Sequence, residues 1–190
     1  MAKGAKTVFV CGECGYESSK WLGRCPNCES WNTFVESAPV QQIKKGISSQ
    51  RALPLREVQA DAARRIPSGI GELDRVLGGG IVGGSAVLLG GDQGIGKSTL
   101  LMQMAGSLIN QGSVLYVTGE ESAAQLKLRA QRLGAGGDML LLAETDITVI
   151  ESEIERIKPA FLIIDSIQTM YCPDIASAPG SVSQVREATS

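Results

Sequence analysis

Apolar residues follow two alternating spacings through most of the second half of the chain. Short, mainly apolar runs predict buried strands, and they lie at 85–90, 114–118, 138–142 and 161–165. Between these runs apolar residues recur at helical spacing, which predicts a helix from Leu100 to Leu108, a helix over 121–133 and a helix from Ile147 to Ile157. Apolar strands that alternate with helices predict an α/β domain whose parallel sheet is covered on both faces.

The first 65 residues show no such alternation and have a different composition. They hold ten basic and six acidic residues, whereas residues 66–190 hold eight and fourteen. Five of the eight aromatic residues lie within the first 34 positions, and four of the five cysteines lie within 11–28. We therefore predict a small module over 1–36, a linker over 37–65 and the α/β domain over 66–190.

The four clustered cysteines form two CxxC pairs that ten residues separate: Cys11 with Cys14, and Cys25 with Cys28. Two residues between cysteines let both sulfurs of one turn face a common centre, and two such turns complete a tetrahedral site that suits structural Zn²⁺. Iron in a rubredoxin-like site is the main alternative. A disulfide pair or a redox motif suits paired CxxC motifs in a cytoplasmic protein less well.

The metal also explains how so small a module folds. About 30 residues bury too little surface to be stable alone, so metal binding supplies the missing stability. We expect Trp21, Trp31 and Phe34 to cover the site. The fifth cysteine, Cys172, lies apart, and we interpret it as a small buried apolar residue near a strand end.

A glycine-rich loop at 91–98 follows the first predicted strand and has the pattern GxxxxGK followed by serine. A strand, this loop and a helix in that order predict a phosphate-binding loop. Its glycines let backbone N–H groups approach the phosphates, and the helix N-terminus favours negative charge. Lys97 would contact the β- and γ-phosphates of a nucleotide, and Ser98 would bind Mg²⁺. The predicted nucleotide-binding residues are Gly91, Asp92, Gln93, Gly94, Ile95, Gly96, Lys97, Ser98 and Thr99.

Two further strands end in carboxylates. Asp165 closes the apolar run 161–165, and Glu120 follows the run 114–118. Ligands of parallel sheets bind at the C-terminal ends of the strands, so both side chains are expected at the nucleotide. We predict that Asp165 holds Mg²⁺ through its water shell and that Glu120 orients and deprotonates the attacking water. Glu121 is the alternative base, although an acid in the first turn of a helix is favourable without catalysis.

The composition narrows the chemistry further. The chain contains no histidine, which excludes a serine–histidine triad and a histidine general base. The net charge of −2 indicates neither a nucleic-acid surface nor a membrane surface. No apolar run is long enough to span a membrane, and the N-terminus lacks the apolar core of a signal peptide, so we expect a cytoplasmic protein without a membrane partner.

Several motifs together resemble the bacterial RadA (Sms) family of RecA-like DNA repair ATPases. The similarity covers essentially the whole chain. It includes the CxxCG motif at 11–15, the phosphate loop, and the segments 21–28, 31–33, 68–80, 119–122 and 162–166. A similarity also extends through 177–181 and 184–187.

This resemblance implies a zinc ribbon before a RecA-like core, with ATP, Mg²⁺ and Zn²⁺ as cofactors. It implies a DNA-dependent, helicase-like ATP hydrolase that binds single-stranded or branched DNA and promotes branch migration in recombinational repair. It further implies a hexameric ring with ATP between subunits, and a recombinase as a partner. Lys97, Glu120 and Asp165 would keep their roles. Residues 173–187 would lie in or beside a DNA-facing loop, although only Arg186 among them is basic.

The resemblance also implies core strands and a C-terminal domain that are absent from these 190 residues. In RecA-like sheets a strand from beyond Asp165 lies between the phosphate-loop strand and the strand that ends in that aspartate. We therefore expect a parallel sheet that is incomplete at the C-terminus, as in a fragment. One alternative is a zinc- and nucleotide-binding interaction module without turnover. A KaiC-like ATPase is another, but it leaves the cysteine module unexplained.

Overall fold

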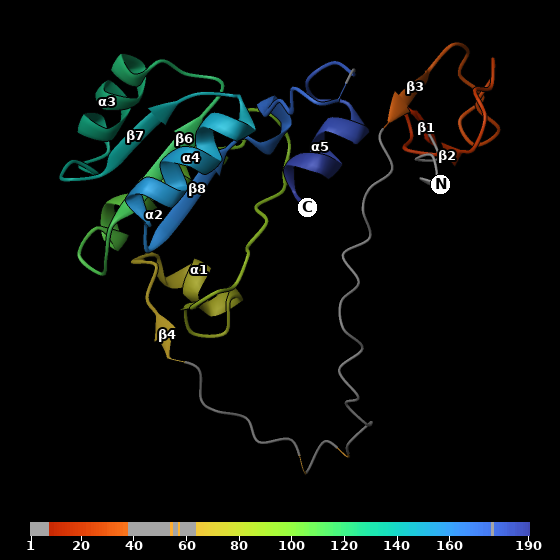
Figure 1. Ribbon diagram of the computed structural model, residues 1–190. Coiled ribbons are helices and arrows are strands. Elements are labelled where there is room, and N and C mark those ends of the chain that lie inside the picture. The colour runs from red at the N-terminus through yellow and green to blue at the C-terminus, as the bar shows by residue number, and fades with distance from the viewer. Residues whose placement is uncertain (1–7, 38–53, 55–56, 58–63, 176) are drawn as a thin grey trace. The chain divides into compact units, whose positions relative to one another are not determined.

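The computed structural model describes residues 8–37, 54, 57, 64–175 and 177–190. These residues fall into two compact units: one joins the residues before 40 with those from 89 onward, and the other holds those between 40 and 88. The elements of each are labelled in Figure 1. The predicted linker over 37–65 lies almost entirely outside the described residues.

The cysteine module is a small antiparallel sheet that carries two cysteine turns. Its strands β1 (Val8–Cys11), β2 (Glu17–Ser18) and β3 (Phe34–Ser37) lie in the order β2-β1-β3. The buried centre consists of Cys11, Cys25 and Phe34, against which the other two cysteines pack. Metal-binding residues therefore take the place of an ordinary apolar core.

The core of the α/β domain is a parallel sheet of three strands with the order β7-β6-β8. The chain passes through α2 (Lys97–Leu108), β6 (Val114–Thr118), α3 (Ala123–Arg132), β7 (Leu140–Ala143), α4 (Ile147–Ile157) and β8 (Phe161–Asp165). The central strand β6 is buried along its full length. The predictions for 114–118 and 161–165 are confirmed to the residue, whereas the strand predicted at 138 begins at Leu140.

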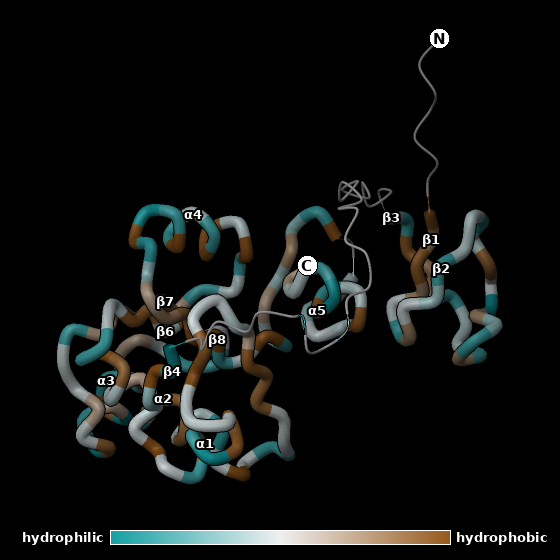
Figure 2. Tube along the Cα trace, turned by 90° about the horizontal axis from the view of Figure 1, so that it is seen from below, coloured by the Kyte–Doolittle hydropathy of each residue, from teal (hydrophilic) through white to brown (hydrophobic). Residues whose placement is uncertain are grey.

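Helices cover both faces of this sheet, as the apolar strands predict. Leu115 and Val117 on β6 pack with Ile150 of α4 on one face. Side chains alternate along a strand, so Tyr116 points to the other face, where α2 and α3 lie. Figure 2 shows α4 on one side of the three strands and α2 and α3 on the opposite side.

The strand predicted at 85–90 is absent, which corrects the sequence analysis. The segment has no strand geometry, and Val87 and Leu88 are 54% and 88% exposed. A strand needs a neighbour for its backbone N–H and C=O groups. In the described part of the chain, β8 pairs only with β6, and no strand joins its other edge to residues 85–90. Hydrophobicity alone therefore does not place this segment in the sheet.

The smaller unit is a short hairpin closed around one helix. Strands β4 (Arg65–Ile66) and β5 (Ile81–Val82) pair antiparallel, and α1 (Gly71–Val76) lies between them in sequence. Gly80 has a φ of +126°, and a Cβ there would lie 2.6 Å from the carbonyl oxygen of Ile66. Only glycine therefore fits at the point where the chain returns to β4.

The last described segment folds around one buried glutamine. It contains a 3₁₀ turn (Ile167–Thr169) and α5 (Val182–Ala188). Gln184 of α5 is fully buried, and its Nε2 donates to the carbonyl oxygens of Cys172, Ile175 and Ser177 at 3.0–3.2 Å. Its Oε1 accepts from the backbone N–H of Cys172 at 2.7 Å. This side chain therefore determines the path of the loop that precedes α5.

Replacing this glutamine should destabilise the protein. In Gln184→Leu the three carbonyls and the amide of Cys172 lose their partner in a buried place, and we expect a loss of about 3 kcal/mol in the free energy of unfolding. Urea denaturation measures this quantity. Gln103→Leu, at an exposed position of α2, is the matched control and should change it by less than about 0.5 kcal/mol. Equal effects of the two substitutions would contradict the role assigned to Gln184.

Candidate nucleotide site and metal centre

The four cysteine sulfurs form one compact cluster. All four lie within 4.8 Å of one another, and the pairs Cys11–Cys28 and Cys14–Cys25 are each 3.6 Å apart. Tetrahedral Zn²⁺ with Zn–S bonds of about 2.3 Å requires sulfurs about 3.8 Å apart. The cluster therefore has the size and the ligand set of a closed four-thiolate metal site.

The two cysteine turns are built alike. The N–H of Gly15 donates to the carbonyl of Cys11 at 2.8 Å, and the N–H of Glu29 donates to that of Cys25 at 2.9 Å. Both donors have a positive φ, of 72° at Gly15 and 62° at Glu29. This conformation is easy for glycine and unfavourable for glutamate. The second turn therefore keeps the metal-binding geometry at some conformational cost.

Hydrogen bonds prepare part of this cluster for metal. Burial opposes ionisation of Cys11, but hydrogen bonds from the Thr33 hydroxyl, 3.1 Å from its Sγ, and from backbone N–H groups lower its pKa to about 6. Burial raises the pKa of Cys25 to about 11. A hydrogen bond with the Ser30 side chain also lowers the pKa of Cys28. Hydrogen bonds therefore favour the thiolate form at Cys11 and Cys28, whereas the metal must displace the proton of Cys25.

The expected aromatic cover of the site is only partly confirmed. Phe34 packs in the cysteine cluster and is 5% exposed. Trp21 and Trp31 are 52% and 69% exposed and lie outside that cluster. The Trp21 indole N–H donates to the carbonyl of Phe34, and the Arg24 guanidinium lies over the Trp31 ring. The tryptophans are thus held at the surface by polar contacts.

The predicted phosphate loop is an exposed turn at the start of α2. Gly91, Gly94 and Gly96 have φ values of +156°, +82° and +104°. The Lys97 Nζ donates to the carbonyl oxygens of Gly91 and Asp92, both at 2.8 Å. The loop thus curls around the ammonium group that would contact the phosphates. Ser98 follows in the first turn of α2.

The connection between α2 and β6 brings the loop to the carboxylates. The short segment 109–113 links the end of α2 to the start of β6, and α2 packs against β6 and β8. The helix therefore runs antiparallel to the strands. Its N-terminus lies at the end of the sheet where the parallel strands β6 and β8 terminate.

Glu120 lies at that end of the sheet and contacts the segment after β8. The Ser166 hydroxyl donates to Oε1 of Glu120 at 2.8 Å. The buried Thr118 hydroxyl accepts from the backbone N–H groups of Glu120 and Glu121, which fixes the turn after β6. Glu120 thus links the segment after β6 to the segment after β8, and its partner Ser166 follows Asp165 directly in the sequence.

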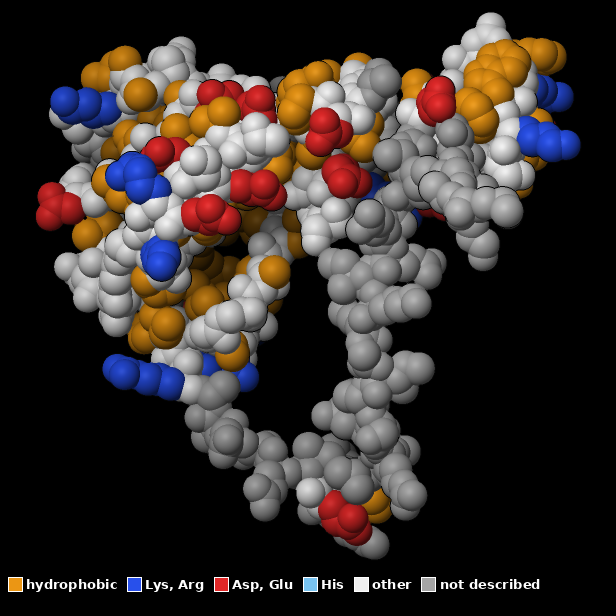
Figure 3. Space-filling model, in the orientation of Figure 1, with side chains coloured by type: hydrophobic (Ala, Val, Ile, Leu, Met, Phe, Trp, Pro, Cys, Tyr) orange, Lys and Arg blue, Asp and Glu red, His pale blue; other side chains and the backbone are white. Residues whose placement is uncertain are grey.

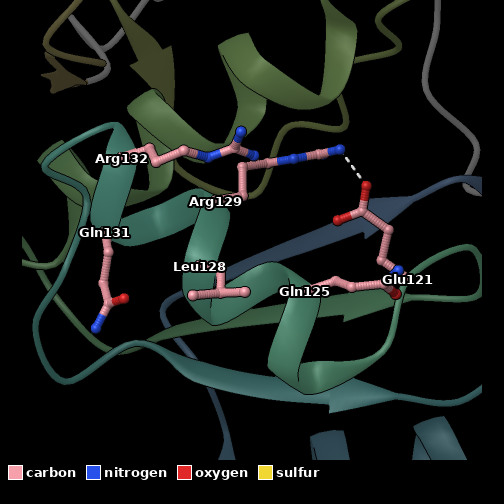
Figure 4. Close-up of a pocket in the computed structure, with 6 residues that line it drawn as sticks. All are labelled: Glu121, Gln125, Leu128, Arg129, Gln131 and Arg132. Carbon is pink, nitrogen blue, oxygen red and sulfur yellow. Dashed lines mark hydrogen bonds and ion pairs between the residues drawn. The ribbon is translucent and has the colours of Figure 1, made fainter.

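Glu121 has a different environment. Its carboxylate forms an ion pair with Arg129 of α3, and both side chains are 23% exposed. Figure 4 shows this pair in a surface pocket that is also lined by Gln125, Leu128, Gln131 and Arg132. Oε1 of Glu121 is therefore paired with Arg129, whereas its Oε2 is buried without a hydrogen-bond partner among the described residues. Glu120 instead contacts Ser166, directly after β8.

Asp165 is held by a tyrosine that the sequence analysis missed. Asp165 is 8% exposed, and its Oδ2 accepts a hydrogen bond from the Tyr116 hydroxyl at 2.7 Å. Burial, followed by this hydrogen bond, raises the pKa of Tyr116 above its ordinary value. The signal in the sequence was a phenol inside an otherwise apolar strand, where its hydroxyl needs a partner.

The charges of the α4 face do not suit nucleic acid. Acidic side chains gather over the helix in Figure 3, and Glu151, Glu153 and Glu155 lie on it against one arginine, Arg156. A DNA backbone would be repelled there.

None of the helices in the described ranges has both the length and the apolar composition that a membrane-spanning helix requires.

Two family models match parts of the chain. A zinc-ribbon model described as a rubredoxin metal-binding domain matches residues 9–36. An ATPase model described as KaiC matches residues 66–140. The zinc ribbon followed by a RecA-like ATPase domain, as the sequence resemblance implies, is therefore confirmed at the level of the fold.

Curated proteins with about 50% sequence identity to this chain are named DNA repair protein RadA. DNA repair protein RadA of Streptococcus pyogenes serotype M6 is 53% identical over 195 residues, that of Bacillus subtilis (strain 168) 50% over 203, and that of Listeria monocytogenes 49% over 199. The chain is homologous along its whole length to the N-terminal region of RadA proteins. Each match covers 100% of this chain and 43% of the RadA relative. The resemblance to the RadA family is confirmed on these grounds.

Proposed function

We propose that this protein is an ATP-hydrolysing DNA repair protein that binds single-stranded or branched DNA and promotes branch migration. One observation carries the proposal: Glu120 accepts a hydrogen bond from Ser166, the residue after Asp165. This contact lies at the end of the sheet where α2 and the phosphate loop before it begin. The names of the RadA relatives support the DNA repair role. A hexameric ring and a recombinase partner belong to the same proposal.

The residues fit a nucleotide with Mg²⁺. Mg²⁺ prefers oxygen ligands and keeps several of its waters, and Asp165 and Ser98 offer a carboxylate and a hydroxyl. The residues 91–99 would bind the phosphates through backbone N–H groups and Lys97. When bound, Mg²⁺ neutralises charge on the phosphates. Glu120 would orient the attacking water and accept its proton at the carboxylate.

A nucleotide- and zinc-binding module without turnover is the second candidate function. The exposed segment 85–90 favours it, because the phosphate loop is then not anchored on a paired strand. A loop without this support would bind phosphate yet hold it less firmly for chemistry.

ATP hydrolysis with and without single-stranded DNA separates the two candidates. The proposed function predicts turnover that DNA stimulates and that Lys97→Ala abolishes, because the lysine charge on the phosphates is lost. Lys127→Ala, on the exposed surface of α3, is the matched control and should behave as the wild type. ATP binding without turnover, under both conditions, would support the module instead.

A further inference from the structure

The contact between Tyr116 and Asp165 is buried and specific. Tyr116 lies in the middle of the central strand and is fully buried, although its ring carries a polar hydroxyl. Asp165 is the last residue of the neighbouring strand β8. The hydroxyl meets Oδ2 at 2.7 Å across 49 positions of sequence. The contact is therefore created by the sheet and not by local sequence.

The register of the sheet explains how the two side chains meet. Thr118 lies opposite Asp165, and Tyr116 lies opposite Ile163, two positions earlier on the same face. Diagonal neighbours on one face are within reach of a long aromatic side chain. The phenol therefore extends along the sheet toward the C-terminal ends of the strands, and its hydroxyl reaches the Asp165 carboxylate there.

This contact gives the two oxygens of the Asp165 carboxylate different surroundings. Oδ2 accepts a hydrogen bond from the Tyr116 hydroxyl, and within the described part of the chain Oδ1 accepts no hydrogen bond. An ionised carboxylate accepts at both oxygens. Because one oxygen is tied to the sheet, rotation of the carboxylate about its χ2 angle is restricted, and the second oxygen is presented in one direction.

We propose that Tyr116 is a positioning residue for Mg²⁺: it fixes the Asp165 carboxylate so that Oδ1 faces the water shell of the ion. The inference rests on the proposed nucleotide-binding function. Tyr116 itself touches neither nucleotide nor metal and acts only through Asp165. A phenol that merely satisfied its own buried hydroxyl would have no influence on the metal.

Tyr116→Phe tests this inference because it keeps the ring and removes the hydroxyl. Affinity for a fluorescent ATP analogue is measured against Mg²⁺ concentration and also without metal. We expect the Mg²⁺ concentration for half-maximal effect to rise about tenfold, since a hydrogen bond to a charged group is lost, while metal-free affinity stays unchanged. Tyr171→Phe is the matched control, because the Tyr171 hydroxyl contacts no partner in the described residues.

The Asp165→Ala background adds a second, independent result. If Tyr116 acts through Asp165, adding Tyr116→Phe to Asp165→Ala should leave the Mg²⁺ dependence where Asp165→Ala alone put it. An unchanged Mg²⁺ dependence in Tyr116→Phe, an equal shift in Tyr171→Phe, or a loss of metal-free binding would each overturn the inference. Failure of the wild type to bind the analogue, with or without Mg²⁺, would instead remove the proposed function itself.

Discussion

Cys25→Ser should leave the protein without zinc, compared with about one ion per chain in the wild type. Cys25 is fully buried in the sulfur cluster, and a serine hydroxyl is a poor substitute for a thiolate. Structural zinc contributes about 10–16 kcal/mol of apparent binding free energy in isolated fingers. Because sulfurs replace an apolar core here, the module over residues 8–37 should lose its fold with the ion. Metal analysis and the near-ultraviolet circular dichroism of the tryptophans report the two effects.

Cys172→Ser is the matched control for this prediction. Cys172 is also buried, but it lies outside the four-sulfur cluster, so its substitution should leave the zinc content unchanged. Lowering the pH should weaken zinc binding in the wild type, because protons compete for the thiolates. A Cys25→Ser protein that still binds one zinc would contradict the assignment. A red protein that contains iron would establish the rubredoxin-like alternative.

Glu120→Gln should abolish ATP turnover and leave ATP binding intact. The amide keeps the size of the side chain and can still contact Ser166, but it cannot accept a proton from water. Loss of a general base typically lowers a rate by about 100- to 10,000-fold. Phosphate release under saturating ATP measures the rate, and equilibrium binding of an ATP analogue measures the affinity.

Glu121→Gln is the internal comparison for Glu120→Gln. Its carboxylate pairs with Arg129, so the substitution should lower stability while turnover stays within a few fold of the wild type. The reverse pattern, in which Glu121→Gln stops turnover and Glu120→Gln does not, would identify Glu121 as the base. It would also mean that the ion pair with Arg129 opens in the active protein.

The sequence predicted the elements whose pattern depends on their own residues. The runs 114–118 and 161–165 are strands to the residue because each holds several consecutive apolar residues, and the sheet buries β6 along its full length and β8 in part. The CxxC pairs predicted the cluster because two residues between cysteines determine the geometry of a turn. The positions of Glu120 and Asp165 at one edge followed from the rule that parallel strands end together.

Features that depend on partners elsewhere in the chain were not predicted. The run 85–90 is as apolar as a buried strand, yet it finds no neighbour among the described residues. Trp21 and Trp31 are large and apolar, but a hydrogen bond and a cation contact hold them at the surface. The contact between Tyr116 and Asp165 depends on strand register, which hydrophobicity does not reveal.

The chemical state of bound nucleotide tests most directly whether the phosphate loop, Glu120 and Asp165 form one centre that hydrolyses ATP. The protein is mixed with less than one equivalent of ATP and Mg²⁺, with single-stranded DNA present, then quenched and analysed for ATP and ADP. The wild type should convert the bound ATP to ADP, whereas Glu120→Gln should keep it as ATP over the same time. Intact ATP on the wild type, or equal conversion by both proteins, would contradict the account.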